Sequence, residues 1–150
     1  MSVEVLFYQL MHQPLEAALP QLLGKCLERD WRVVVQTGSE ARCNALNDHL
    51  WTYAADAFLP HGTKADGHAE RQPIYLTSEG DAPNQPAVRF LVDRAVPPAL
   101  ADYTRVIFMF DGNDPEAMQD ARVRWKEAKA EGFEVTYWQQ GQQGNWERKA

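Results

Sequence analysis

Apolar positions along the chain form short runs that alternate with segments of helical spacing. The runs are rich in β-branched and aromatic residues and are too short for buried helices, which predicts strands. These strands are expected at 3–10, 31–36, 73–77, 87–93, 103–110 and 133–139. Apolar residues recurring every three or four positions predict helices after Pro14, from about Glu40 to Leu50, and from Asp114 to Glu131.

Proline and capping residues set the expected helix ends. Pro20 lies inside the first helical pattern and is expected to kink or restart that helix, because proline has no N–H to donate. Asn113 or Asp114 is expected to cap the last helix, with Pro115 in its first turn and Gly132 at its end.

Strands that alternate with helices predict an α/β fold, a three-layer sandwich with a largely parallel central sheet. The connection between the strands predicted at 73–77 and 87–93 is the turn-rich SEGDAPNQP, which is too short for a helical crossover. These two strands are therefore either antiparallel or joined by an irregular crossover. The 150 residues fit a single domain, 1–150, and no internal repeat or linker divides them.

Charge and cysteine usage narrow the class of protein. A net charge of −6 argues against binding to nucleic acid through a basic surface, so no direct nucleic-acid binding is expected. The first residues, MSVEVLFYQL, lack the features of a secretory signal, and no apolar run approaches the roughly 20 residues of a membrane span. Cys26 and Cys43 lack CxxC spacing, which favours buried, reduced thiols in a cytosolic protein.

Motifs for cofactors and metals are missing. The first strand is followed by MHQP and the second by TGSE, and neither GxGxxG nor GxxxxGK[ST] occurs, so no nucleotide cofactor is expected. His61, His68 and Glu70 match no compact zinc pattern, and no metal is expected there.

The sequence FDGND offers one route to an enzyme. Asp111 follows the strongest predicted strand and Asp114 lies three residues further on, so the two carboxylates could share a magnesium ion in an orphan α/β enzyme. In the structural alternative, Gly112 turns the chain and Asn113 or Asp114 caps the helix. No second acidic cluster completes a catalytic site, which favours the structural alternative.

The stretch DHLWTYAADAFLPHG, residues 48–62, is the least generic part of the chain. It places Trp51, Tyr53, Phe58 and Leu59 in a segment too irregular for a core element, which indicates a loop or a broken helix end. Aromatic side chains on such a segment are typical of a binding surface. The alternative is a satellite cluster in which they pack back under the sheet.

The last predicted helix carries a mixed stripe. At 100° per residue, three alanines and Arg124 share the sector expected against the sheet. The adjoining shoulder consists of Met118, Arg122, Trp125 and Lys129, flanked by Lys126. Arginine can grip a carboxylate at two points while tryptophan supplies an apolar wall, so the stripe suits an acidic peptide with apolar groups. The alternative is a solvated helix face with Trp125 half-buried at the core edge.

The ordered series FYQL, WRVVVQ, HLWTY, FLPHG, FDGND, ARVRWKEAKAEGFEV and TYWQQ resembles the chi subunit family of the bacterial DNA polymerase III holoenzyme. The resemblance covers nearly the whole chain, residues 64–86 being least distinctive, and rests on the ordered set. It implies a fold like nucleotide-binding domains without their phosphate loop. It also implies a non-catalytic clamp-loader accessory subunit of this nucleotidyltransferase, located in the bacterial cytoplasm at the replisome. The implied partners are the psi subunit and the acidic, phenylalanine-ended C-terminal tail of the single-stranded-DNA-binding protein.

The resemblance also assigns a surface for psi. Trp51 and Phe58, with Pro60 beside them, match the family's psi-contacting residues, and His61 falls next to them. A chi-like adaptor for a DNA-repair helicase would use the same aromatic surface, so the sequence leaves psi and a helicase open as partners.

For the tail site, Arg122 matches the family's arginine that meets the tail, and Trp125 falls where better-known members have tyrosine. Met118 falls where those members have lysine, and Asp111 replaces an apolar residue at the pocket edge. Lys126 and Lys129 are candidates for the replacement charge.

Overall fold

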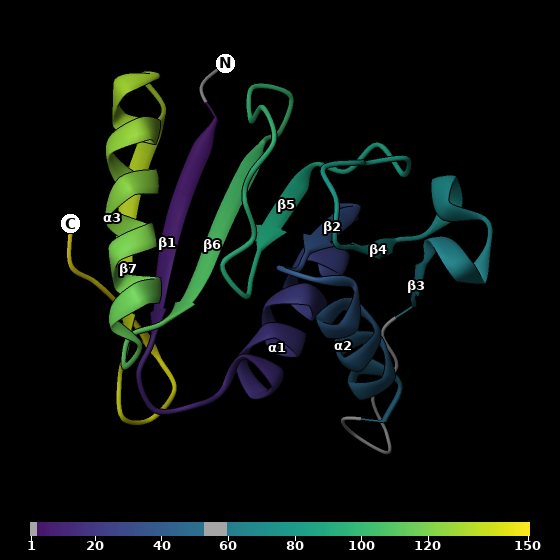
Figure 1. Ribbon diagram of the computed structural model, residues 1–150, viewed down its shortest axis with the longest axis horizontal. Coiled ribbons are helices and arrows are strands. Elements are labelled where there is room, and N and C mark those ends of the chain that lie inside the picture. Colours follow the sequence, from purple (N-terminus) through teal and green to yellow (C-terminus); the bar gives the residue numbers. More distant parts are fainter. Residues whose placement is uncertain (1–2, 53–59) are drawn as a thin grey trace.

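The computed structural model describes residues 3–52 and 60–150. The described residues form an eight-stranded sheet in the order β3-β4-β2-β5-β6-β1-β7-β8 (Figure 1). The strands are β1 Glu4–Leu10, β2 Val33–Gln36, β3 His61–Thr63, β4 Ile74–Thr77, β5 Val88–Leu91, β6 Arg105–Asp111, β7 Glu134–Gln140 and β8 Trp146–Arg148. The helices are α1 Leu15–Glu28, α2 Glu40–Thr52 and α3 Pro115–Ala130, with the short 3-10 helices η1 Lys64–Asp66 and η2 Ala69–Arg71.

The sheet is parallel except at one edge. All pairings from β3 through to β7 are parallel, and only β8 runs antiparallel, against β7, in the described part of the chain. Strands β4 and β5 both pair with β2 in parallel, on its two sides. The antiparallel alternative for these two strands is therefore wrong, and the irregular crossover is confirmed. The three-residue strands β3 and β8 were not predicted.

Two apolar layers lie on opposite faces of the sheet. Alternate residues of β1 divide between them, because successive side chains of a strand point to opposite faces. Leu6 and Leu10 pack with α1 and α2, whereas Val5 and Phe7 pack under α3. The face of α3 against the sheet consists of Ala117, Ala121 and Ala128, as the helical spacing predicted. The expected three-layer sandwich is confirmed, and Figure 1 shows α3 along β1 and β7 with α1 and α2 side by side.

Helix α1 runs through Pro20, so the predicted restart at this proline is wrong. Proline removes the N–H that would have bonded the carbonyl oxygen of Glu16, four residues earlier. The ring Nε2 of His49 on α2 lies 2.8 Å from that oxygen and replaces the missing partner. A tertiary contact thus compensates for the proline. Among the described residues, no helix has the length and apolar character of a membrane span.

The connection between β4 and β5 is organised by a buried arginine instead of a helix. Arg89 on β5 is 0% exposed. Its guanidinium donates to the side-chain oxygen of Gln36, to the carbonyl oxygens of Glu79 and Asp81, and to the hydroxyl of Tyr103. These contacts tie the loop after β4 and the segment before β6 to β2 and β5.

Candidate protein-binding surfaces

A crevice of about 660 Å³ opens where β1 and β6 end. The chain leaves β1 into α1 on one face of the sheet and leaves β6 into α3 on the other. Ligands of open α/β sheets bind at such switch points. Asp111 and Asp114, the carboxylates of the enzyme hypothesis, both line this crevice.

Hydrogen bonds give both aspartates a structural role. Asp111 Oδ1 accepts the backbone N–H of Asn113 at 2.8 Å. Asp114 is the N-cap of α3 and its Oδ1 accepts the N–H of Glu116 at 3.0 Å, as one of the two predicted caps. Among the described residues, no group of three His, Cys, Asp or Glu side chains could hold a metal ion. The contacts support the structural alternative for this pair.

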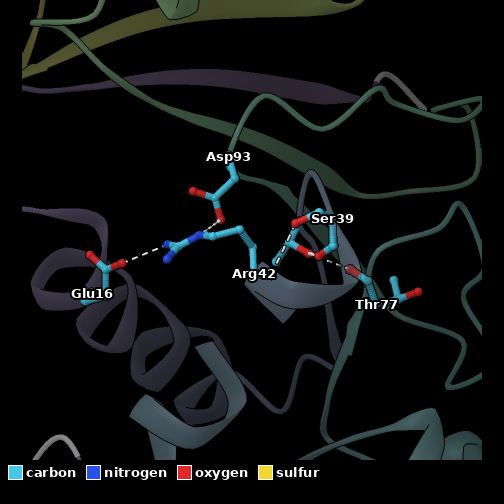
Figure 2. Close-up of polar contacts among 6 residues, drawn as sticks. Glu16, Ser39, Arg42, Thr77 and Asp93 are labelled. Atoms are coloured by element: carbon cyan, nitrogen blue, oxygen red, sulfur yellow. Dashed lines mark hydrogen bonds and ion pairs between the residues drawn. The ribbon is translucent and has the colours of Figure 1, made fainter. Parts of the chain in front are cut away.

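The arginines of the crevice are engaged by carboxylates. Figure 2 shows Arg42 of α2 between Glu16 of α1 and Asp93 after β5, with N–O distances of 2.8 and 3.1 Å. The hydrogen bond from Arg42 lowers the pKa of the Glu16 carboxyl. Arg94 likewise pairs with two α3 carboxylates, at 2.7 and 2.5 Å. Because each guanidinium already has two carboxylate partners, neither is well placed to receive a phosphate.

The surface assigned to psi lies at the end of α2. Trp51 is 50% exposed, and its ring lies 4.3 Å from that of His61 between centroids. His61 is 4% exposed, with Nε2 at 3.2 Å from the carbonyl oxygen of Asn47. Pro60 is half-buried beside it. Phe58 lies outside the described residues, so the structure brings together Trp51, Pro60 and His61 of the four.

The stripe on α3 surrounds one half-buried indole. The Trp125 ring packs edge-on against Phe7 of β1 at 5.5 Å and against Tyr137 of β7 at 6.0 Å between centroids. The Lys129 ammonium lies 5.2 Å from the Trp125 ring centroid, a cation–π contact. Met118 is also half-buried on the same core. Trp125 therefore lies half-buried at the edge of the core, as the solvated-face alternative predicted. The outer side of its indole ring stays accessible to solvent.

Three cations of the stripe are free of carboxylates. Arg122, Lys126 and Lys129 are exposed, and none takes part in an ion pair among the described residues. Arg124, on the sheet-facing side, instead pairs with Glu127 at 3.1 Å. On a chain of net charge −6, three unpaired cations beside an indole form a local attraction for anionic groups.

Tyr137 completes this surface, and the sequence analysis did not identify it. Its ring lies 6.0 Å from both Trp125 and Phe110, and its hydroxyl donates to the side-chain oxygen of Gln9. Burial raises the pKa of the Tyr137 hydroxyl, and nearby Arg122 partly opposes the rise. The alternation of TYWQQ was the available signal, because it places Tyr137 on the same face as Val135, toward α3.

Over the described residues, the fold and these surfaces define a three-layer α/β protein with two separate side-chain patches and no phosphate-binding loop. A family model described as DNA polymerase III chi subunit, HolC, matches residues 2–136, and the chain belongs to this family of replication accessory subunits. The probable DNA polymerase III subunit chi of Rickettsia prowazekii (strain Madrid E) is 36% identical over 75 residues, which cover 50% of this chain and 46% of that relative. The match thus spans about half the length of the relative.

Proposed function

We propose that the protein is a non-catalytic replisome adaptor. It links the clamp loader, through the psi subunit, to the acidic C-terminal tail of the single-stranded-DNA-binding protein. Membership of the chi family supports the replication role. The observation that carries the tail proposal is the set of unpaired cations, Arg122, Lys126 and Lys129, around the half-buried Trp125. The adaptor is expected to bind no nucleotide and to have no polymerase or ATPase activity.

Each group of the stripe has a matching group on such a tail. Arg122 can form a two-point bond to the free carboxylate, since its guanidinium presents paired N–H donors. Trp125 and Met118 offer an apolar wall for the terminal phenyl ring. Lys126 and Lys129 are placed to attract the aspartates, and Lys129 already lies over the indole. The tail would therefore bind by its charge and its ring together.

Titration of a synthetic acidic, phenylalanine-ended peptide tests the site. Charge-assisted bonds contribute roughly 1.5–3 kcal/mol, so Arg122→Ala is expected to weaken peptide binding about tenfold to a hundredfold. Binding should also weaken as salt rises through the physiological range, because the charges are exposed. Arg124→Ala is the matched control, since Arg124 lies in the sheet-facing sector of α3, away from the stripe, and should change affinity far less. Equal affinities of wild type and Arg122→Ala would move the tail site elsewhere.

The second surface, formed by Trp51, Phe58, Pro60 and His61, is proposed to bind psi. Phe58→Ala should remove about 2 kcal/mol or more of partner binding, as buried aromatic anchors do, while the melting temperature is retained. Val123→Ala, at an exposed apolar site on α3, is the control. A sharp fall in melting temperature for Phe58→Ala would instead make Phe58 part of a satellite core.

A repair helicase is the alternative partner for the Trp51 surface. Both partners would contact the same aromatic surface, so an experiment has to identify which of them the protein binds. A pull-down from native extract with wild type and Phe58→Ala would decide: loss of psi supports the proposal, and loss of a helicase with psi absent from both samples supports the alternative.

A further inference from the structure

The hairpin of β7 and β8 lies at the edge of the sheet, and β8 is beyond residues 2–136 of the family match. Its position is fixed by aromatic packing on the α1 side. Trp146 stacks on Tyr8 of β1 with ring centroids 4.5 Å apart and planes 20° apart. Trp138 of β7 meets the same tyrosine edge-on at 6.3 Å. Packing on one face thus sets which residues of β8 point to the other face.

The other face of the hairpin is the α3 side, and Lys149 points to it. Successive residues of a strand alternate, so Trp146 and Arg148 share the Tyr8 side while Glu147 points to the opposite one. The 3.5 Å ion pair with Glu147 brings the ammonium of Lys149, the residue after β8, to the side on which Glu147 lies. The N–H groups of both Lys149 and Ala150 donate to the carbonyl oxygen of Tyr137, at 2.7 and 3.4 Å. Two residues facing one is a β-bulge, and it sets Lys149 opposite Tyr137.

Tyr137 is the residue that joins this hairpin to the α3 stripe. Its ring packs on Trp125, and burial raises the pKa of its hydroxyl while nearby Arg122 opposes the rise. The backbone of Lys149, just after β8, therefore lies beside that of Tyr137, while Arg122 lies near the Tyr137 hydroxyl on α3. The side chain of Lys149 is 48% exposed and that of Glu147 is 52% exposed. An ion pair that open to solvent is weak, so the ammonium is available to another anion.

We propose that Lys149 is a further anion contact for the acidic tail, which lies across Tyr137 with its carboxylates held by Arg122 on α3 and by Lys149 just after β8. The inference rests on the proposed function of the α3 stripe. The cation would come from a residue outside the family-matched range 2–136.

The chain provides a matched control for this proposal. Arg148 carries the same charge, lies next in sequence and points to the opposite face of β8. The acidic peptide is titrated at low salt against Lys149→Ala, Arg148→Ala, Arg122→Ala and wild type. An exposed ion pair corresponds to up to about a fivefold change, so Lys149→Ala is expected to weaken binding about threefold while Arg148→Ala stays close to wild type. Equal losses for both variants would show a general charge effect and overturn the proposal.

The remaining outcomes separate this inference from the proposed function. Unchanged affinity in Lys149→Ala, together with a large loss in Arg122→Ala, would remove Lys149 from the site and leave the tail site standing. Unchanged affinity in Arg122→Ala would overturn the proposed tail site itself. A charge swap adds a direct readout: Lys149→Glu should recover affinity toward a peptide in which one particular aspartate is replaced by lysine. Recovery with none of the single replacements would argue against direct contact.

Discussion

Arg89 and Arg122 have the same side chain but lie in opposite environments. Arg89 is fully buried in β5, and its guanidinium makes five hydrogen bonds inside the protein. Arg122 is exposed on α3 and takes part in no ion pair among the described residues. A cation whose donors are all satisfied internally supports the fold, whereas one with free donors is available to a partner. The two arginines thus differ in whether their donors are used by the fold or are open to a partner.

Burial is possible for Arg89 because its donors are matched. An unpaired charge in the interior costs several kcal/mol, and hydrogen bonds must compensate that cost. The acceptors are neutral oxygens: one side-chain amide, two carbonyls and one hydroxyl. Asp81, the neighbouring carboxylate, receives the hydroxyls of Tyr75 and Thr77 at 2.7 and 2.6 Å. The loop after β4 is thus held by a connected polar network in place of a crossover helix.

The comparison predicts its largest effect at Arg89. Arg89→Met removes the guanidinium and leaves its buried acceptors without donors, so the free energy of unfolding should fall by about 4 kcal/mol. Denaturant unfolding followed by circular dichroism measures this loss. Arg122→Met is the control and should stay within about 0.5 kcal/mol of wild type, as exposed substitutions usually do. A loss below about 1 kcal/mol at Arg89 would show that the loop does not depend on this network.

Sequence patterns predicted the elements that carry their own signal. The long apolar runs gave the central strands, the spacing of Ala117, Ala121 and Ala128 gave the buried side of α3, and the turn FDGND gave the Asp114 cap. Strands β3 and β8 have three residues each, too few for a period to be visible. Their stability comes from pairing with a neighbour, which is tertiary information.

The remaining differences have the same origin. An arginine within AVRFLV normally indicates a solvent-facing position, so the sequence could not show that Arg89 is buried and organises the β4–β5 connection. Pro20 predicts a break in the helix, because the sequence does not show that His49 bonds the carbonyl oxygen of Glu16 that the proline leaves free. At the candidate site, the residues of α3 followed from helical spacing, whereas Tyr137 reaches Trp125 only through strand pairing.

Arg42 is intermediate in burial between Arg89 and Arg122. It tests whether the loss of unfolding free energy on replacing an arginine increases with burial. Its side chain is 41% exposed, and it links α1 to the segment after β5 through Glu16 and Asp93 (Figure 2). Partly exposed ion pairs contribute roughly 0.2–1 kcal/mol each, so Arg42→Met should lower the free energy of unfolding by about 1 kcal/mol near neutral pH. This effect is much smaller than that of Arg89→Met.

The difference in unfolding free energy between wild type and Arg42→Met should also depend on pH, and Glu16 determines the direction of that dependence. The hydrogen bond from Arg42 lowers the Glu16 pKa below its ordinary value of 4.5 in the folded protein. The folded state therefore holds the charged carboxylate more strongly than the unfolded chain does, and the stabilisation is present above pH 4.5. It disappears as the pH falls through the lowered pKa, so wild type and Arg42→Met should converge in acid. Adding Glu16→Gln to both proteins should remove the part of the pH-dependent difference that comes from Glu16. A difference that stays constant down to the lowered pKa would show that Arg42 acts through packing of its aliphatic stem instead of through the ion pair.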